Sequence, residues 1–244
     1  MVQGGRVGSR QEYQRALRAM PASEWTAFLD ADSGLPGPRG NLELIQAAAD
    51  EGNAGWFEEL VTDPDEFRAA TGAVGLGRLL ADAPDEQVTA CLHELAADRR
   101  WRVREAVAMA LQRLGDADPA RLWPLARAWA LDPDPLVQRA AVAGVCEPRL
   151  LRPPAAAAVA LEICGTATMT LAARPRGQRR SDGVRSLRQA LGYCWSVAVA
   201  ADPGIGVPRF LALADDPDPD VMWIVRENGR KARLVRALNG AGRA

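Results

Sequence analysis

The chain has 244 residues and a net charge of -1, with 48% hydrophobic and 25% charged residues. This is the composition of a folded globular protein, and it excludes a disordered, collagen-like or membrane-embedded chain. Aromatic residues make up only 5% of the sequence, while Ala, Leu and Arg dominate. Because these residues favour helices and β-branched runs are scarce, we expect an all-α protein.

The two ends of the chain are expected to be flexible tails. The N-terminal residues contain no apolar segment of the kind found in a secretory signal, so we expect a tail over 1–9 and a cytoplasmic location with reduced thiols. A single domain is expected over 10–238, followed by a second tail over 239–244. Two stretches rich in Gly, Pro and charge, 33–41 and 174–183, are predicted surface connections.

Charge is distributed unevenly along the sequence. Residues 1–98 contain 17 acidic and 7 basic residues, whereas residues 99–244 contain 14 acidic and 23 basic residues. The predicted domain therefore has an acidic part, 10–98, and a basic part, 99–238. A basic surface attracts phosphates or acidic partners, and it can equally pair with the acidic part of another copy.

Metal, cofactor and membrane binding are not expected. The cysteines stand 55, 18 and 30 residues apart with a single histidine in the whole chain, a spacing that does not fit a zinc site. The most apolar stretch, 155–173, is built largely from Ala and Thr and carries Glu162. It is too weakly apolar to span a bilayer, so a buried helix is predicted. The four cysteines are Cys91, Cys146, Cys164 and Cys194.

Asp-Pro pairs recur before amphipathic segments, at residues 63, 118, 132, 134, 202, 216 and 218. Aspartate is a favoured N-cap and proline fits the first helical position, so several of these pairs predict helix starts. Apolar anchors in successive segments, Val103, Val137, Val184 and Val221, lie 34, 47 and 37 residues apart. This period, with two helices per unit, predicts a right-handed α-solenoid of about five to six HEAT-like helical pairs.

The helical period of 3.6 residues places the expected pairs. Within the second helices, Val107 and Ala141 fall on the apolar face and are predicted to be buried. Two further pairs are expected between residues 10 and 81. The other expected pairs are 84–97 with 101–114, 119–131 with 135–146, 153–172 with 182–200, and 205–214 with 219–238.

The segment 126–151 resembles the repeat of the DNA-alkylation-repair HEAT-like proteins. Trp129, then Arg139 followed by alanine, and the tail Pro148-Arg149-Leu150 match that pattern, and the similarity covers roughly 98–151 and 215–236. The resemblance implies a curved helical domain that holds duplex DNA in a basic concave groove. It also implies aromatic and acidic side chains facing an alkylated base, as in a base-excision glycosylase.

The sequence departs from this family where its chemistry would take place. The run before the tail, Ala143-Gly144-Val145, contains no acid. The nearest equivalent of another branch's Trp and Asp is Trp101 with Glu105, one helical turn apart on one face. A carboxylate beside an indole can stabilise an alkylated base, which makes Glu105 the candidate catalytic residue. The alternative is that Trp101 is a rim residue and Glu105 an ordinary surface charge.

Helical phase predicts one binding face. Several side chains fall 140–200° from the anchor valines, on the side opposite the core, where the second helices of a solenoid line the concave surface. Trp, Tyr and Arg are typical of binding hot spots for protein or nucleic acid. With no other catalytic motif present, the expected function is a non-enzymatic scaffold for a protein partner or duplex DNA, and the alternative is a glycosylase. The expected binding residues are Trp101, Arg139, Ser186, Tyr193, Trp223, Arg226 and Arg230, with Arg179 and Arg180 from the connection.

Overall fold

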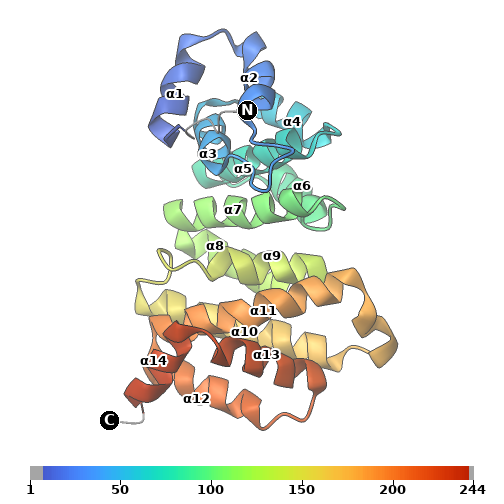
Figure 1. Ribbon diagram of the computed structural model, residues 1–244, viewed down its shortest axis with the longest axis vertical. Helices are drawn as coiled ribbons and strands as arrows, with labels where there is room; N and C mark the ends of the chain where they lie inside the picture. The colour runs from blue at the N-terminus through green and yellow to red at the C-terminus, as the bar shows by residue number, and fades with distance from the viewer. Residues whose placement is uncertain (1–7, 242–244) are drawn as a thin grey trace. The chain divides into compact units, whose positions relative to one another are not determined.

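The computed structural model describes residues 8–241, which form fourteen α-helices and two short 3-10 helices without any β-strand in that range (Figure 1). The helices belong to two compact units, one ending at Arg113 and the other beginning at Leu114. The boundary lies inside helix α7 (Trp101–Ala117). The all-α prediction is therefore confirmed. The predicted tail residues 1–7 and 242–244 lie outside the described residues, and residues 239–241 belong to the last helix.

The first unit is organised around one buried helix, α5. This helix packs against α2, α3, α4 and α6, while α1 packs against α3. Side chains cap the starts of α1, α3, α4, α5 and α6; Ser9, for example, forms a capping box with Glu12 at the start of α1. The helices of this unit are α1 Arg10–Ala19, α2 Trp25–Asp32, α3 Leu42–Glu51, α4 Ala54–Thr62, α5 Glu66–Asp82 and α6 Glu86–Ala96, with the 3-10 turn Ala22–Glu24 and the first part of α7.

Glycines let α5 approach its neighbours closely. A Cβ atom added to Gly77 would lie 2.4 Å from the Cα of Ala110 in α7, and one added to Gly75 would lie 2.3 Å from the ring of Phe57 in α4. Real Cβ atoms do not come this close to other atoms. The contact between α5 and α7 at Gly77 is therefore one of backbone against backbone.

The second unit consists of helical hairpins packed in sequence. In each hairpin the first helix (α8, α10, α12) packs against the second (α9, α11, α13), and α11 lies between α9 and α13. Helix α14 packs against α11, α12 and α13. The helices are α8 Pro119–Ala130, α9 Pro135–Val145, α10 Pro154–Ala173, α11 Asp182–Ala201, α12 Pro203–Ala214, α13 Pro219–Gly229 and α14 Ala232–Ala241, with the 3-10 turn η2 Arg176–Arg180 between α10 and α11.

Asp-Pro-Asp corners lead into three second helices. In each corner the first aspartate accepts the backbone N–H of the second, at 2.7 Å before α5, 2.7 Å before α9 and 2.8 Å before α13. The second aspartate then caps the helix by accepting backbone N–H groups of the first turn. The predicted helix starts at these positions are confirmed. The corners are Asp63-Pro64-Asp65, Asp132-Pro133-Asp134 and Asp216-Pro217-Asp218.

Two details of the helical pairing differ from the expectation. The described helices make six to seven pairs and not five to six, because residues 10–82 contain five α-helices where two pairs were predicted. The segment 219–238 is also not one helix, since α13 ends at Gly229 and α14 begins at Ala232. The buried amide of Asn228 holds the end of α13 by accepting the N–H of Ser196 and donating to the carbonyl of Leu191.

Helix α10 is long and apolar enough to cross a membrane by length and composition, yet 56% of its apolar 18-residue stretch is buried inside the protein. It packs against five other helices of its unit, as predicted for a core helix. Its Cys164 sulfur lies 3.6 Å from that of Cys146, and both are buried free thiols. Contact with Cys164 and burial raise the pKa of the Cys146 thiol. Among the residues that the structure describes, no group of three potential ligands could hold a metal ion.

Candidate functional site

Trp101 and Glu105 line the same pocket in the first unit. The cavity has a volume of about 390 Å³ and is formed by α3, α5, α7 and the segment 38–40. The indole of Trp101 is 52% exposed, and the guanidinium of Arg102 lies 4.5 Å from its ring centroid. We call this cavity the apolar pocket. Its apolar lining includes Leu42, Ile45, Phe67, Ala70, Ala106 and Met109, and its other polar side chain is Arg39.

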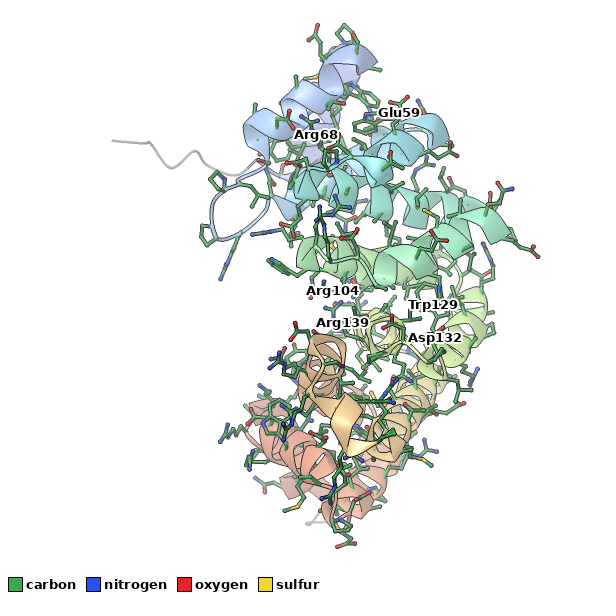
Figure 2. The ribbon with its side chains drawn as sticks, turned by 90° about the vertical axis from the view of Figure 1, so that its right-hand side faces the viewer. Glu59, Arg68, Arg104, Trp129, Asp132 and Arg139 are labelled. Carbon is green, nitrogen blue, oxygen red and sulfur yellow. The ribbon has the colours of Figure 1, made fainter. Side chains whose placement is uncertain are left out.

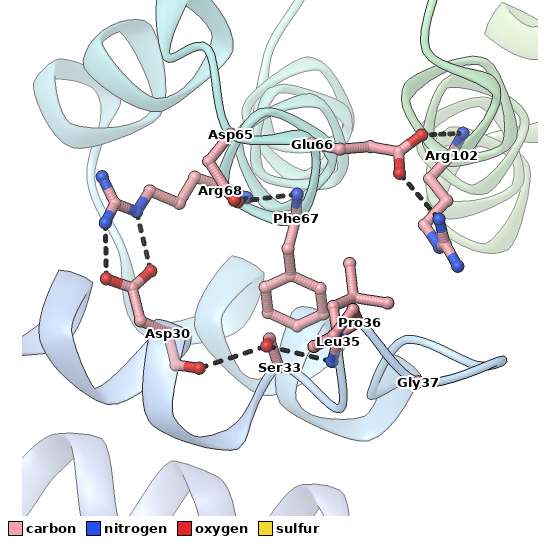
Figure 3. A pocket seen from close by; sticks show the side chains of 10 residues that line it. All are labelled: Asp30, Ser33, Leu35, Pro36, Gly37, Asp65, Glu66, Phe67, Arg68 and Arg102. Atoms are coloured by element: carbon pink, nitrogen blue, oxygen red, sulfur yellow. Dashed lines mark hydrogen bonds and ion pairs between the residues drawn. The ribbon is translucent and has the colours of Figure 1, made fainter.

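A second cavity of about 630 Å³ lies beside the first and shares Phe67 and Arg102 with it (Figure 3). We call it the acidic pocket. The Arg102 side chain donates to Glu66 at 2.7 Å, and Arg68 is held by ion pairs to Asp30 and Asp63. The remaining lining consists of Ser33, Asp65 and the segment 35–37.

The charges around Arg68 stabilise each other. Burial alone would raise the pKa of Asp63, but bonds from the Asp65 N–H and the Arg68 side chain lower it below its ordinary value. Bonds from Asp30 and Asp63 raise the pKa of Arg68 in turn. The guanidinium of Arg68 is therefore already neutralised by two carboxylates. This leaves it little electrostatic attraction for a further anion.

Tyr193 forms an aromatic and cationic cluster in the second unit. Its ring is 44% exposed, the guanidinium of Arg233 lies 4.8 Å from the ring centroid, and the ammonium of Lys231 lies 5.9 Å from it. Arg233 also donates a hydrogen bond of 2.8 Å to the tyrosine hydroxyl. The cations therefore hold the tyrosine ring in place at the surface.

Trp223 of α13 packs on α11 next to this cluster. A Cβ atom at Gly192 would lie 2.8 Å from the Trp223 ring, so the glycine provides the space in which the indole rests. Arg188 covers the ring, with its guanidinium 4.8 Å from the centroid, and forms an ion pair of 2.6 Å with Asp220. Trp223 is thus half-buried, with its ring between Gly192 and Arg188.

Arg179 has a structural role. It forms ion pairs with Asp218 and Asp220 and donates to the backbone carbonyls of Ala172 and Arg174. Burial alone would raise the pKa of Asp218, but the Arg179 bond and N–H groups of the first turn of α13 lower it. These contacts tie η2 to the start of α13. The neighbouring Arg180 is exposed.

The remaining expected residues differ in how accessible they are. Arg226 of α13 is exposed, and Arg230, which follows this helix, is exposed and forms an ion pair of 2.6 Å with Glu227. Ser186 of α11 is half-buried. Arg139 is half-buried on α9, and Figure 2 labels it together with Trp129 and Asp132.

The residues that match the alkylation-repair pattern contribute to packing and surface ion pairs. Trp129 is 5% exposed at the end of α8, so its indole belongs to the core. Arg149 forms ion pairs with Asp116 and Glu147. The Glu105 side chain lines the apolar pocket, and Glu105 also interacts with another residue of the fold.

Sequence reasoning missed three cations of the second unit. Arg188, Lys231 and Arg233 each lie over an aromatic ring. The contacts of Lys231 and Arg233 join residues about forty positions apart in the chain. Lys231 and Arg233 also fall in the segment expected to continue α13. No local signal in the sequence brings them to Tyr193.

Helical hairpins packed in sequence in an all-α chain are consistent with a HEAT-repeat solenoid. Residues 53–146 match the family model for HEAT repeats. A comparison with curated proteins gives no significant match. Two crystal structures of engineered proteins are similar to the chain. One is 15% identical, with coverage of 96% of this chain and 100% of that protein and a TM-score of 0.41. The other is 16% identical, with coverage of 95% and 89% and a TM-score of 0.34.

Proposed function

We propose that the protein is a non-enzymatic HEAT-repeat scaffold that binds a protein partner through the second helices of its second unit. The observation that carries this proposal is the pair of ordered aromatic rings, Tyr193 and Trp223, each with arginine packed on it. Tyrosine, tryptophan and arginine dominate binding hot spots because they bury a large area at a small cost in conformational entropy. We call the surface of Tyr193, Trp223, Arg226 and Arg230 the aromatic–arginine face.

The charge of this part of the chain favours an acidic partner. Residues 114–244 contain 18 basic and 13 acidic residues. Arg226 is exposed on the aromatic–arginine face, and Arg180 is exposed on η2. Complementary charge accelerates association and fixes the orientation of the partner. A protein segment that carries carboxylates beside an aromatic or aliphatic side chain fits both features of this surface.

The test is fluorescence anisotropy with the full chain and a labelled peptide that alternates glutamate with leucine. We expect Tyr193→Ala to weaken binding at least about tenfold, because a hot-spot aromatic contributes about 2 kcal/mol or more. Arg226→Glu should weaken it further at low salt. Arg15→Glu, on the exposed surface of α1, is the matched control and should change nothing. Failure of the peptide to bind, or equal affinity for all variants, would contradict the proposal.

The second candidate function, base excision on alkylated DNA, is favoured by one observation: Trp101 and Glu105 line the same pocket. Against it, Arg102 covers the indole, and Arg39 lines the cavity. Two guanidinium groups oppose the entry of a cationic base. We therefore expect no base release when the protein is incubated with methylated duplex DNA.

Two measurements separate this candidate from the scaffold. Base release by the wild type that Glu105→Gln abolishes, with the helical circular dichroism spectrum unchanged, would establish the glycosylase. A salt series with undamaged duplex DNA tests binding alone, because affinity that depends on phosphate contacts falls steeply with salt. Loss of that affinity in Arg226→Glu would place DNA on the aromatic–arginine face, and the scaffold would then be one for nucleic acid.

A further inference from the structure

We infer that the first unit has a binding site of its own, separate from the aromatic–arginine face, for a basic polypeptide segment with a large apolar side chain. The apolar pocket would take the apolar side chain, and the acidic pocket would take an adjacent arginine or lysine. The two cavities are neighbours, because Phe67 and Arg102 line both of them. One extended segment can therefore occupy both.

The apolar pocket is shaped to accept an anchor side chain. Its volume of about 390 Å³ exceeds that of any single side chain, and its lining comes mainly from aliphatic and aromatic residues. Leu42 and Trp101 line it although they are 57% and 52% exposed. Large apolar side chains exposed beside a cavity are typical of a surface that a partner covers. A leucine or phenylalanine of the partner buried in this pocket would also cover Leu42 and Trp101 and remove them from water.

The acidic pocket determines the charge of the partner. Asp30, Asp65 and Glu66 line it, against the two cations Arg68 and Arg102. Arg68 is further neutralised from outside the lining by Asp63. Figure 3 shows Asp30 facing Arg68, Asp65 next to the backbone nitrogen of Phe67, and Glu66 extending toward Arg102. The balance is negative, so a cation is attracted and an anion is repelled.

Asp65 is the carboxylate that caps α5 with only one of its two oxygens. Its Oδ1 atom caps α5 by accepting the N–H groups of Phe67 and Arg68, both at 2.9 Å. Asp65 is exposed, and its second oxygen remains for a guanidinium or ammonium group of the partner. Asp30 and Glu66, by contrast, use both of their oxygens on Arg68 and Arg102. The surrounding unit agrees in charge, since residues 1–113 carry 18 acidic and 12 basic residues.

The experiment measures anisotropy of three labelled synthetic peptides with the full chain. One peptide alternates arginine with leucine, one alternates arginine with serine, and one alternates glutamate with leucine. We expect the arginine–leucine peptide to bind the first unit, the arginine–serine peptide to bind at least about tenfold more weakly, and Tyr193→Ala to leave both unchanged. Binding of the glutamate–leucine peptide belongs to the aromatic–arginine face, so Tyr193→Ala should weaken it and the variants of the two pockets should leave it unchanged.

Substitutions in and outside the two pockets test where the arginine–leucine peptide binds. Trp101→Ala and Leu42→Ala should each weaken it about tenfold, and Leu131→Ala, which removes a 67% exposed leucine of the second unit, should not. Asp65→Asn keeps the helix cap but removes the charge, so it should weaken the peptide up to about fivefold and flatten its salt dependence. Glu59→Gln on α4 is the matched control (Figure 2).

Three results of the peptide experiment would overturn the inference. They are no binding of the arginine–leucine peptide, binding that none of the pocket variants changes, and tighter binding of the glutamate–leucine peptide that depends on Trp101. Sedimentation that shows a dimer dispersed by Trp101→Ala would assign the pockets to a second copy of the chain and would equally overturn it. The proposed function is judged separately, because its variant Tyr193→Ala lies in the other unit.

Discussion

The close approach of α5 and α7 can be tested with a single methyl group. Gly77 lies in the middle of α5, where alanine is normally preferred by about 1 kcal/mol. Here, however, the added Cβ atom would lie 2.4 Å from the Cα and 2.6 Å from the Cβ of Ala110. Neither atom is the end of a flexible side chain, so the two helices must move apart. We expect Gly77→Ala to destabilise the protein.

The magnitude follows from two opposing effects. Overpacking a close-packed interior costs about 1–3 kcal/mol, and cases in which backbone must move lie at the upper end. The gain in helix propensity offsets about 1 kcal/mol of this cost. The net loss in the free energy of unfolding is therefore about 1–2 kcal/mol. In a chain of this length that corresponds to a fall in Tm of roughly 2–8 °C.

A second glycine provides the control. Gly165 lies in the middle of α10, and a Cβ atom there meets nothing within 4 Å. Gly165→Ala should therefore raise the stability by about 0.5–1 kcal/mol. Urea unfolding followed by circular dichroism measures both variants. If Gly77→Ala were as stable as the wild type, α5 and α7 could not lie as close as the structure places them.

Two further predictions concern the core and the corners. Ala141→Asp places an unpaired charge at a position with 0% exposure and should unfold or aggregate the protein, at a cost of several kcal/mol; Ala120→Asp, exposed in the first turn of α8, should be tolerated, and thermal unfolding compares the two. The lowered pKa of Asp218 predicts stability that is complete above about pH 4, the range of an unfolded aspartate, and is lost as the pH falls below it. Asp218→Asn should lower the free energy of unfolding by about 1–2 kcal/mol near neutral pH, since Arg179 loses a partner, and should make the stability less sensitive to acid. If the urea midpoint of the variant equalled that of the wild type both near neutral pH and below about pH 4, the ion pair would have no stabilising role.

The helical architecture could be predicted because its signals are local. The Asp-Pro starts and the apolar period of the second helices depend only on neighbouring residues. The contacts that join α13 to α11 could not be predicted in the same way. The amide of Asn228 makes them with Ser196 and Leu191, which lie 32 and 37 residues away in the sequence.

The candidate sites also combine local features, which the sequence predicts, with contacts between distant residues, which it does not. Trp101 and Glu105 are one helical turn apart, so the sequence could place them together, and they do line one cavity. The rest of that cavity comes from α3 and α5, and its acidic neighbour depends on ion pairs between distant positions, such as Arg68 with Asp30. Helical phase cannot provide these contacts, because it describes one helix at a time.

The turns before α5, α9 and α13 have the same Asp-Pro-Asp structure, so one could replace another. Each carries the same two hydrogen-bonding steps, and each uses proline only where no backbone N–H is needed. A corner that satisfies its own polar groups places few demands on the helices it joins. Whole hairpins can then be duplicated, deleted or exchanged at these points while the turns stay intact. Rearrangement of hairpins would give such a chain new combinations of helix surfaces without a change in the turns.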